Sequence, residues 1–427
     1  MADKFVGPAR ERMAESHLID WPDAKLPHWI KGGNESPARV ACFASLIDSN
    51  TLDQAKAISR MSCVTPFVAV MPDAHLGKGA AVGTVVPTKG AVIPAAVGVD
   101  LGCGMIAVKT NFQLEEITGW AEVWAPLEEL RDAVERAIPL SAGNYNTSDA
   151  RFPFTRKRIA VLEKMAGSLH VDFKGIRNSE NWPHQLGTLG GGNHFIELSY
   201  DVEGFVWLFL HSGSRGVGNA LANRRIKQAQ ELCRTWQVPL EHADLAFLPE
   251  GTREFDQYLR EVKWAQHFAL LNREEMMDRF LAVFRDWFGG VNPVVTERIN
   301  CHHNYIEREG DLWITRKGAI DAHTGKLGVI PGSMGDKSYV VQGLGNPTGL
   351  HSAPHGAGRL YSRSKAKLLF TEDDLRDQMG DIVYRQGPEW IDEAPSCYKP
   401  IAQVISDAKT LVKPIAELTQ LMNVKGT

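Results

Sequence analysis

The segment Val97-Gly-Val-Asp-Leu-Gly-Cys-Gly-Met105 decides how the rest of the chain is interpreted. Asp100 and Cys103 stand three residues apart between glycines, which allow the backbone to turn sharply and bring both side chains to one place. A hard carboxylate beside a soft thiolate suits a metal site. The alternative is a glycine-rich turn around a buried cysteine, because a free cysteine often behaves as a small hydrophobic residue.

The bulk composition is that of an ordinary globular protein: 427 residues, of which 44% are hydrophobic and 23% are charged. We find no apolar run long enough to span a bilayer and no apolar signal region at the N-terminus, so we expect no membrane partner. Six cysteines without disulfide-framework spacing indicate a reducing compartment, and we expect a cytoplasmic protein. The net charge of -4 requires that any nucleic acid be held by a local basic cleft.

Hydrophobic patterning predicts an α+β fold with a β-rich core around a central metal cleft. Short valine- and alanine-rich segments such as residues 91–99 indicate strands. Amphipathic patterns predict peripheral helical insertions at about residues 112–170 and 218–290, and residues 372–422 are expected to be helical in parts, before a tail. No repeat or low-complexity linker separates modules, so we expect a single domain over residues 1–427.

Two histidines downstream strengthen the metal interpretation. His194 follows Gly190-Gly-Gly-Asn193, where consecutive glycines let the chain approach a ligand closely. His211 follows an apolar predicted strand, and the planar guanidinium of Arg215 beyond it can bind a phosphate. One thiolate able to bridge two ions, with imidazole and carboxylate groups beside it, would suit a two-metal site for phosphoryl chemistry.

A further ligand is expected from the adjacent pair His302 and His303. On a strand, adjacent side chains point to opposite faces, so at most one of the two readily serves the site of Cys103. The periodicity does not choose between them. His355 is left over after these ligands and is a candidate nucleophile.

Two loops look suited to phosphate chemistry. Met71-Pro-Asp-Ala-His-Leu-Gly-Lys-Gly79 can bring backbone N–H groups and a lysine to a phosphate, while Asp73 or His75 handles protons or orients water. The alternative is a turn whose aspartate caps its own backbone. Residues 331–338 form a second turn rich in hydroxyls and glycines. The basic run at residues 363–367 is typical of a solvated helix face.

Six motifs in this order carry a resemblance to a known family. They are Pro72-Asp-Ala-His-Leu-Gly-Lys-Gly79, Gly98-Val-Asp-Leu-Gly-Cys-Gly-Met105, Gly192-Asn-His-Phe-Ile-Glu197, His211-Ser-Gly-Ser-Arg-Gly216, Asn300-Cys-His-His-Asn-Tyr305 and His355-Gly-Ala-Gly-Arg359. Together they resemble the RtcB family of RNA-splicing and RNA-repair ligases, particularly its intein-free bacterial members. The resemblance extends from about residue 65 to residue 426.

The resemblance implies an RtcB-like fold and a GTP-dependent, manganese-dependent ligase. Such an enzyme joins an RNA 3′-phosphate or 2′,3′-cyclic phosphate to a 5′-hydroxyl through a guanylylated histidine and an RNA-(3′)pp(5′)G intermediate. The partners implied are RNA with these ends and GTP, and an archease-like activator protein is a further candidate partner. tRNA, ribosomal RNA and messenger RNA all remain open as the physiological substrate.

The resemblance also assigns site residues. Cys103 would bridge two Mn²⁺ ions, and the remaining metal ligands would be Asp100, His194, His211 and, from the adjacent pair, His302. The catalytic residues would be His355 as the guanylylated nucleophile, with Asp73, Asn193 and Arg215. The residues around GTP would be Asn193, Phe195, Glu197, Ser333, Met334, Gly335, Ser338, His355, Gly356, Ala357, Gly358, Tyr398 and Lys425.

Two alternatives to the ligase stay open. One is a metal-dependent 2′,3′-cyclic phosphodiesterase or RNA 3′-end guanylyltransferase that does not seal. The other is a non-catalytic GTP-binding accessory protein of RNA repair. The presence of Cys103, three histidine ligands and His355 argues against the accessory protein, because a binding module needs no nucleophile.

Overall fold

The computed structural model describes residues 18–21, 26–33, 37, 39–147, 152–176 and 181–426. A larger sheet contains the strands β8 (Gly104–Gln113), β9 (Phe195–Asp201), β10 (Phe205–Ser212), β12 (Val295–His302), β16 (Leu327–Ile330), β17 (Ser338–Gly343) and β19 (Val412–Lys425). A smaller sheet contains β2 (His28–Lys31), β3 (Arg39–Cys42), β5 (Val68–His75), β6 (Val82–Thr88), β13 (Asn304–Glu309) and β14 (Leu312–Lys317).

The order of the strands places segments far apart in the sequence beside one another. Within the described residues, the larger sheet has the order β12-β8-β10-β9-β19-β17-β16, and its neighbouring strands are antiparallel. The smaller sheet has the order β13-β14-β6-β5-β3-β2 and includes one parallel pair, β3 with β5. Short pairs join β1 (Leu18–Asp20) to β4 (Leu46–Asp48), β7 (Ala91–Val92) to β11 (Leu248–Pro249), and β15 (Ala319–Asp321) to β18 (Ser352–Pro354).

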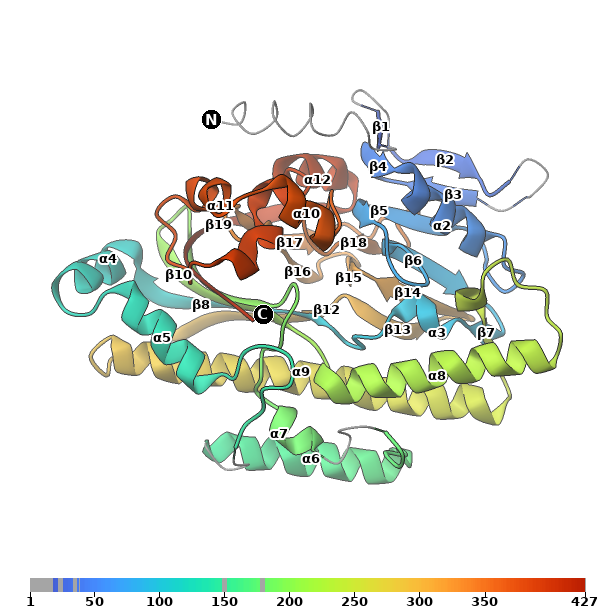
Figure 1. Cartoon of the computed structure of the whole chain (residues 1–427), viewed down its shortest axis with the longest axis horizontal. Coiled ribbons are helices and arrows are strands. Elements are labelled where there is room, and N and C mark those ends of the chain that lie inside the picture. Colours follow the sequence, from blue (N-terminus) through green and yellow to red (C-terminus); the bar gives the residue numbers. More distant parts are fainter. Residues whose placement is uncertain are drawn as a thin grey trace.

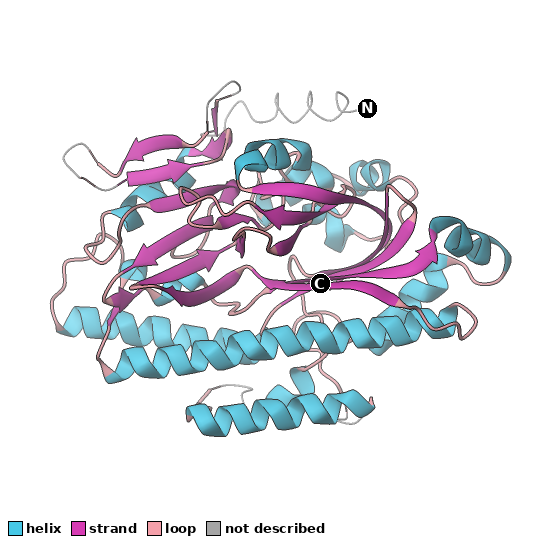
Figure 2. Cartoon of the chain, turned by 180° about the vertical axis from the view of Figure 1, so that it is seen from behind, coloured by secondary structure: helices cyan, strands magenta, loops and turns pink. Residues whose placement is uncertain are grey.

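Helices surround the two sheets (Figures 1 and 2). Two long helices, α8 (Arg215–Thr235) and α9 (Arg253–Trp287), run along one side of the molecule, and α6 (Pro153–Leu169) lies farther out (Figure 1). The other helices are α2 (Ser49–Ser59), α3 (Pro94–Val97), α4 (Leu114–Val123), α5 (Leu127–Ala137), α7 (Trp182–Gln185), α10 (Arg363–Leu369), α11 (Glu372–Met379) and α12 (Ile401–Asp407), with 3-10 turns η2 (Ala243–Leu245), η3 (Pro388–Glu393), η4 (Pro395–Cys397) and η5 (Ala408–Thr410). None of the helices within the described ranges has the length and apolar character that crossing a membrane requires.

The core follows from the alternation of side chains along the strands. In β8, Met105 and Ala107 point into a buried cluster that they share with residues of the smaller sheet. Ile106 and Val108 point to the opposite face, where they belong to a second cluster with Phe280 of α9. Both faces of the larger sheet are therefore buried, one by the smaller sheet and the other by α9. This confirms the expected α+β fold with a strand-rich core.

The sequence located most helices but misjudged the length of one strand. The helices expected within residues 112–170 and 218–290 are present as α4, α5, α6, α8 and α9, although Arg151, where a helix was expected to begin, lies outside the described residues. The strand expected at residues 91–99 ends at Val92, because Pro94 begins α3. Helix α2 is capped by Asp48, whose Oδ1 accepts hydrogen bonds from two backbone N–H groups.

The largest correction concerns the C-terminal segment. Residues 372–422 were expected to be helical in parts, and α11 and α12 confirm this. The end of this segment and the expected tail differ, because residues 412–425 form β19, which lies between β9 and β17 inside the larger sheet. Leu418, Met422 and Val424 are buried there. The strand is stabilised by pairing with residues about 220 positions earlier, such as Lys425 with Phe195, which local pattern does not reveal.

Candidate active site

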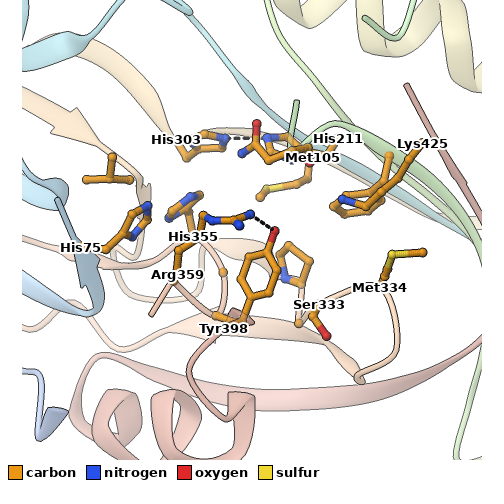
Figure 3. A pocket seen from close by; sticks show the side chains of 18 of the residues that line it. His75, Met105, His211, His303, Ser333, Met334, His355, Arg359, Tyr398 and Lys425 are labelled. Carbon is orange, nitrogen blue, oxygen red and sulfur yellow. Dashed lines mark hydrogen bonds between the residues drawn. The ribbon is translucent and has the colours of Figure 1, made fainter. Parts of the chain in front are cut away.

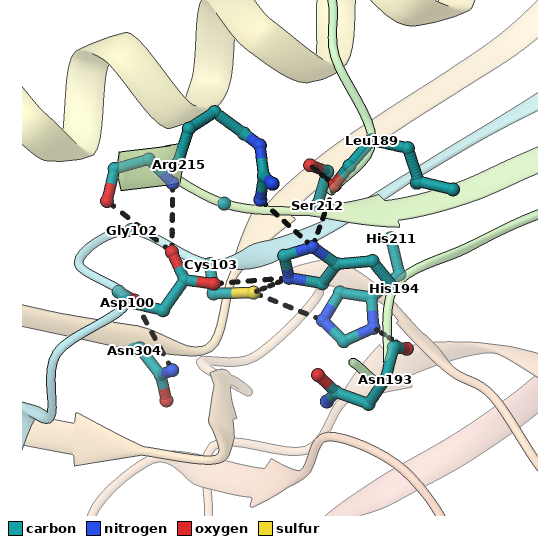
Figure 4. A network of polar contacts seen from close by, with 12 residues as sticks. Asp100, Gly102, Cys103, Leu189, Asn193, His194, His211, Ser212, Arg215 and Asn304 are labelled. Atoms are coloured by element: carbon teal, nitrogen blue, oxygen red, sulfur yellow. Dashed lines mark hydrogen bonds and ion pairs between the residues drawn. The ribbon is translucent and has the colours of Figure 1, made fainter. Parts of the chain in front are cut away.

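Two imidazoles, those of His194 and His211, converge on Cys103, which lies in the turn between α3 and β8 (Figure 4). The Sγ atom of Cys103 lies 3.3 Å from Nε2 of His194 and 3.2 Å from Nε2 of His211. A carboxylate oxygen of Asp100 lies 3.1 Å from the same atom of His194. Nε2 of His303 lies 2.9 Å from Nε2 of His211. Cys103, His194 and His211 are all buried and could together hold a metal ion.

The second ring nitrogen of each histidine fixes its orientation. Nδ1 of His194 lies 2.9 Å from the carbonyl oxygen of Leu189, and Nδ1 of His211 lies 3.1 Å from the carbonyl oxygen of Asn193. A carbonyl only accepts hydrogen bonds, so both Nδ1 atoms carry the hydrogen and both Nε2 atoms keep a lone pair. This arrangement, with one nitrogen held by a carbonyl and the other free, is typical of metal-ligating histidines.

The electrostatics of this cluster fit a bound cation. Burial raises the pKa of the Cys103 thiol well above its usual value, and the Asp100 carboxylate raises it further. Burial lowers the pKa of His211 and of His303, each reinforced by other histidines nearby. Neutral imidazoles with lone pairs facing one another repel each other in the absence of a positive charge. A divalent ion would relieve that repulsion and stabilise the thiolate.

The structure corrects the choice between the two adjacent histidines. His303 points to His211, whereas His302 points away: its Nδ1 donates to the carbonyl oxygen of Gly102 at 2.7 Å and lies 3.1 Å from Nη2 of Arg273. Of the adjacent pair, the residue that lies beside His211 is therefore His303, and not the expected His302. The physical reason is that β12 ends at His302, so His303 lies where the chain passes from the larger to the smaller sheet.

Arg273 holds the loops that carry the candidate metal ligands. The sequence did not reveal these contacts. Its guanidinium is fully buried and donates to the carbonyl oxygen of Gly102 at 2.9 Å and to that of Ser212 at 3.1 Å. Its Nε atom donates to Oδ1 of Asn300 at 2.7 Å. One side chain of α9 therefore connects the Cys103 turn, the end of β10 and the end of β12.

Arg215, expected to bind a phosphate, lies beside His194 of the Cys103 cluster. Its Nη1 lies 3.1 Å from Nδ1 of His194 and its Nε lies 3.3 Å from the hydroxyl of Thr188. Its backbone has a positive φ of 59°, and Gly190 opposite has no room for a side chain, since a Cβ atom there would lie 1.4 Å from Nη2 of Arg215. Glycine at that position allows the guanidinium to lie beside His194.

His355, the candidate nucleophile, is held by Asp73. Nδ1 of His355 donates to Oδ2 of Asp73 at 2.6 Å, and the same oxygen accepts the backbone N–H groups of His355 at 3.1 Å and Gly356 at 3.2 Å. Asp73 is completely buried. The His355 ring lies 4.5 Å from the ring of His303, centroid to centroid. The candidate nucleophile therefore lies next to the cluster of Cys103, His194, His211 and His303.

A cavity of about 250 Å³ extends from His75 past His355 to Lys425 (Figure 3). The expected nucleotide-binding residues that line it are Asn193, Phe195, Glu197, Ser333, Met334, His355, Gly356, Ala357, Gly358, Tyr398 and Lys425. Gly335 and Ser338 are not among the described residues that line it: Ser338 lies behind Glu197, 3.5 Å from its Oε2, and Gly335 packs on Pro395. The lining also includes His75, Arg359, Arg363 and Asn423, which the sequence did not identify as cavity residues.

The pKa values of two buried carboxyl groups at the Lys425 end of the cavity shift in opposite directions. Burial raises the pKa of Glu197 to about 8, against a smaller lowering by Lys425. Glu393 is also buried, yet the cations Lys425, Arg359 and Arg363 outweigh burial and lower its pKa. Glu393 accepts hydrogen bonds from Nζ of Lys425 at 2.5 Å and from the hydroxyl of Tyr398 at 2.6 Å. Glu393 lies outside every motif, so its place at this end of the cavity could not be predicted from the sequence.

The chain is similar to known proteins over most of its length. A family model described as tRNA-splicing ligase RtcB matches residues 54–426. The chain is 40% identical over 424 residues to the RNA-splicing ligase RtcB of Escherichia coli strain K12, covering 96% of this chain and 99% of that protein. It is 27% identical over 458 residues to the tRNA-splicing ligase RtcB of Pyrobaculum aerophilum, covering 90% and 93%. It is 28% identical over 425 residues to the RNA-splicing ligase RtcB of Mycobacterium bovis, covering 83% and 96%. The chain therefore belongs to the RtcB family.

Proposed function

We propose that this chain, an RNA ligase of the RtcB family, joins RNA 3′-phosphate or 2′,3′-cyclic phosphate ends to 5′-hydroxyl ends with the consumption of GTP. The observation that carries the proposal is the contact of His355 with Asp73 at one side and with the metal cluster at the other. An imidazole in such a position, at the centre of a cavity with cationic side chains, suits covalent transfer of a nucleotide.

Asp73 prepares His355 for attack by fixing its tautomer. The short Nδ1 to Oδ2 contact of 2.6 Å places the ring hydrogen on Nδ1, which leaves the lone pair on Nε2 as the nucleophile. The two backbone N–H groups that Oδ2 also accepts hold the carboxylate in place. When Nε2 forms a bond to phosphorus the ring becomes positive, and the buried carboxylate stabilises that charge.

We propose four successive steps at this site. Water opens a cyclic phosphate, Nε2 of His355 attacks the α-phosphorus of GTP, and pyrophosphate leaves. The RNA 3′-phosphate takes the GMP from His355, and the 5′-hydroxyl displaces the GMP. Asn193, Arg359 and Lys317 line the cavity near His355 and offer donors to phosphate oxygens.

We propose two Mn²⁺ ions as the resident metals, bound by a cluster of one thiolate, one carboxylate and three imidazoles. The ligands would be Asp100, Cys103, His194, His211 and His303, the last replacing His302. Bound there, the ions would neutralise charge on phosphate oxygens. Carboxylate and imidazole donors beside one thiolate are a mixed set compatible with Mn²⁺, Co²⁺ or Zn²⁺.

The Lys425 end of the cavity suits a guanine base. The carboxylate of Glu197 can accept two N–H groups of guanine, and the ammonium of Lys425, tethered to Glu393, can donate to the guanine carbonyl. Adenine presents the reverse pattern at these positions, so the same groups would reject it. We infer that GTP is preferred over ATP.

A labelling experiment tests the proposal. Incubation with α-labelled GTP and Mn²⁺, followed by a denaturing gel and mass spectrometry, should give a GMP adduct on His355, and α-labelled ATP should give none. His355→Ala should lose the adduct while its metal content stays unchanged. A labelled His355→Ala variant would overturn the assignment, and metal-loaded protein without any adduct would favour a cyclic phosphodiesterase.

A further inference from the structure

A second imidazole in the cavity is oriented by the same residue as His355. His75 ends β5, and its Nδ1 donates to the backbone carbonyl oxygen of Asp73 at 3.0 Å. The carboxylate of Asp73 holds Nδ1 of His355 in the same way. Both rings therefore carry their hydrogen on Nδ1 and keep a lone pair on Nε2. His75 lines the cavity, and no hydrogen bond from its Nε2 to another described residue is present.

His75 lies at the end of the cavity opposite to the guanine site. Figure 3 shows His75 on one side of His355, with Met334 and Lys425 on the other side. When GMP has moved from His355 to the RNA 3′-phosphate, its guanine lies toward Lys425. Displacement at phosphorus is in line, so the attacking oxygen must approach from the side opposite to the departing GMP. That side is the side of His75.

Only some steps of the proposed reaction need a proton acceptor. The attack of His355 on GTP uses a lone pair that Asp73 has already exposed, and the RNA 3′-phosphate that takes the GMP is already an anion. The opening of a cyclic phosphate by water and the final attack are different, because a neutral water or a neutral 5′-hydroxyl must lose a proton as its oxygen forms a bond to phosphorus. A base is therefore needed in the sealing step, on the His75 side of the phosphorus.

We propose that His75 is the general base of the sealing step, an inference that rests on the proposed function. Its Nε2 takes the proton of the RNA 5′-hydroxyl while that oxygen forms a bond to the 3′-phosphorus. The bond between this phosphorus and the bridging oxygen of GMP breaks, and the electron pair leaves with GMP. The products are a 3′,5′-phosphodiester, GMP and a protonated His75, which returns its proton to water.

The surroundings of His75 are compatible with this role. Burial lowers its pKa to about 4, and His355 and Lys399 lower it as well, while Asp73 raises it. The free imidazole is therefore unprotonated and ready to accept a proton at neutral pH. The anionic phosphates of a bound RNA intermediate would raise the proton affinity of His75, bringing it closer to that of an effective base.

The test separates sealing from the earlier steps. We would compare the wild type with His75→Gln and His75→Ala in three single-turnover measurements: the GMP adduct on His355, transfer of GMP to an RNA 3′-phosphate, and sealing of isolated RNA-(3′)pp(5′)G to a 5′-hydroxyl RNA. The first two rates should stay within about 3-fold of the wild type, and sealing should fall by about 100-fold or more. Leu76→Ala, at an exposed neighbouring position, is the matched control.

The results of these assays decide whether His75 is the base of the sealing step. Partial restoration of sealing in His75→Ala by added imidazole would support a proton-transfer role, since a merely structural residue is not replaced by a soluble base. Sealing by His75→Gln within about 3-fold of the wild type would overturn the proposal, as would an equal loss in all three steps. A wild type that forms no GMP adduct would instead refute the proposed function itself.

Discussion

Replacing Glu197 with glutamine should change the pH dependence of stability in a defined direction. The pKa of this buried carboxyl rises from an ordinary value of 4.5 to about 8 in the folded protein, mainly because of burial. Between these two pH values the unfolded chain loses the proton and the folded chain keeps it, so folding becomes less favourable as pH rises. Above pH 8 the accumulated cost is about 5 kcal/mol, because each pKa unit corresponds to about 1.4 kcal/mol.

Glutamine carries no such cost. The free energy of unfolding of Glu197→Gln, relative to the wild type, should therefore increase steadily from pH 4.5 to pH 8 and then level off. Urea unfolding at five pH values between 4.5 and 9 measures this difference. The side-chain oxygen of glutamine can still accept the hydrogen bond from Nδ2 of Asn423, which lies 3.3 Å from Oε1 of Glu197. The variant thus preserves the local packing.

Glu393→Gln is the matched control with the opposite sign. The pKa of Glu393 is lowered, since Lys425, Arg359 and Arg363 outweigh the effect of burial. Its carboxylate stabilises the fold above the unfolded pKa, and this contribution is lost as pH falls through the folded pKa. Glu393→Gln should be less stable than the wild type at neutral pH and approach it in acid. A pH-independent difference for Glu197→Gln would refute our account of that carboxyl.

Three further predictions concern metal and nucleotide. His303→Ala should weaken Mn²⁺ binding at least about 10-fold in equilibrium dialysis, whereas His302→Ala should leave it within about 3-fold and lower the free energy of unfolding by about 1–3 kcal/mol; equal metal affinities would show that we have misplaced the ligand. Cys103→Ser should lose metal and every reaction step together, as metal analysis and ligation assays would reveal, and a metal-free but active variant would contradict the cluster. Guanine binding should release close to one proton at pH 7, because Glu197 must ionise to accept two N–H groups; calorimetry in buffers of different ionisation enthalpy measures it, and Glu197→Gln should release none.

Much of the candidate site could be predicted from the sequence because its residues lie in short segments with local signals. Glycines flank Cys103 and precede His194, and an apolar run precedes His211. Each signal arises from a turn or a strand end, which depends on nearby residues alone. The pairing of β8, β9, β10 and β12 then brings these segments to the same end of four adjacent strands of the larger sheet. The candidate ligands can be recognised in the sequence because cysteine and histidine are unusual residues at glycine-rich turns and strand ends.

The remaining features depend on contacts between distant segments. The choice of His303 over His302 depends on where the chain leaves one sheet for the other, and strand alternation does not hold across such a crossing. Glu393 lies in a 3-10 turn without a motif, and only folding brings it to Lys425. Arg273 looks like any helical arginine until three loops are placed around it. Sequence alone therefore predicts reactive groups better than the groups that hold them.

The position of β19 has a consequence for how the protein is made. During synthesis on the ribosome, the strands on both sides of β19 emerge before it, since β9 and β17 precede residue 412. Until residues 412–425 emerge, β12-β8-β10-β9 and β17-β16 lack the strand that joins them. The larger sheet can close only after nearly all of the described chain has left the ribosome. A nascent chain without residues 412–425 would thus lack Asn423 and Lys425, two residues that line the cavity.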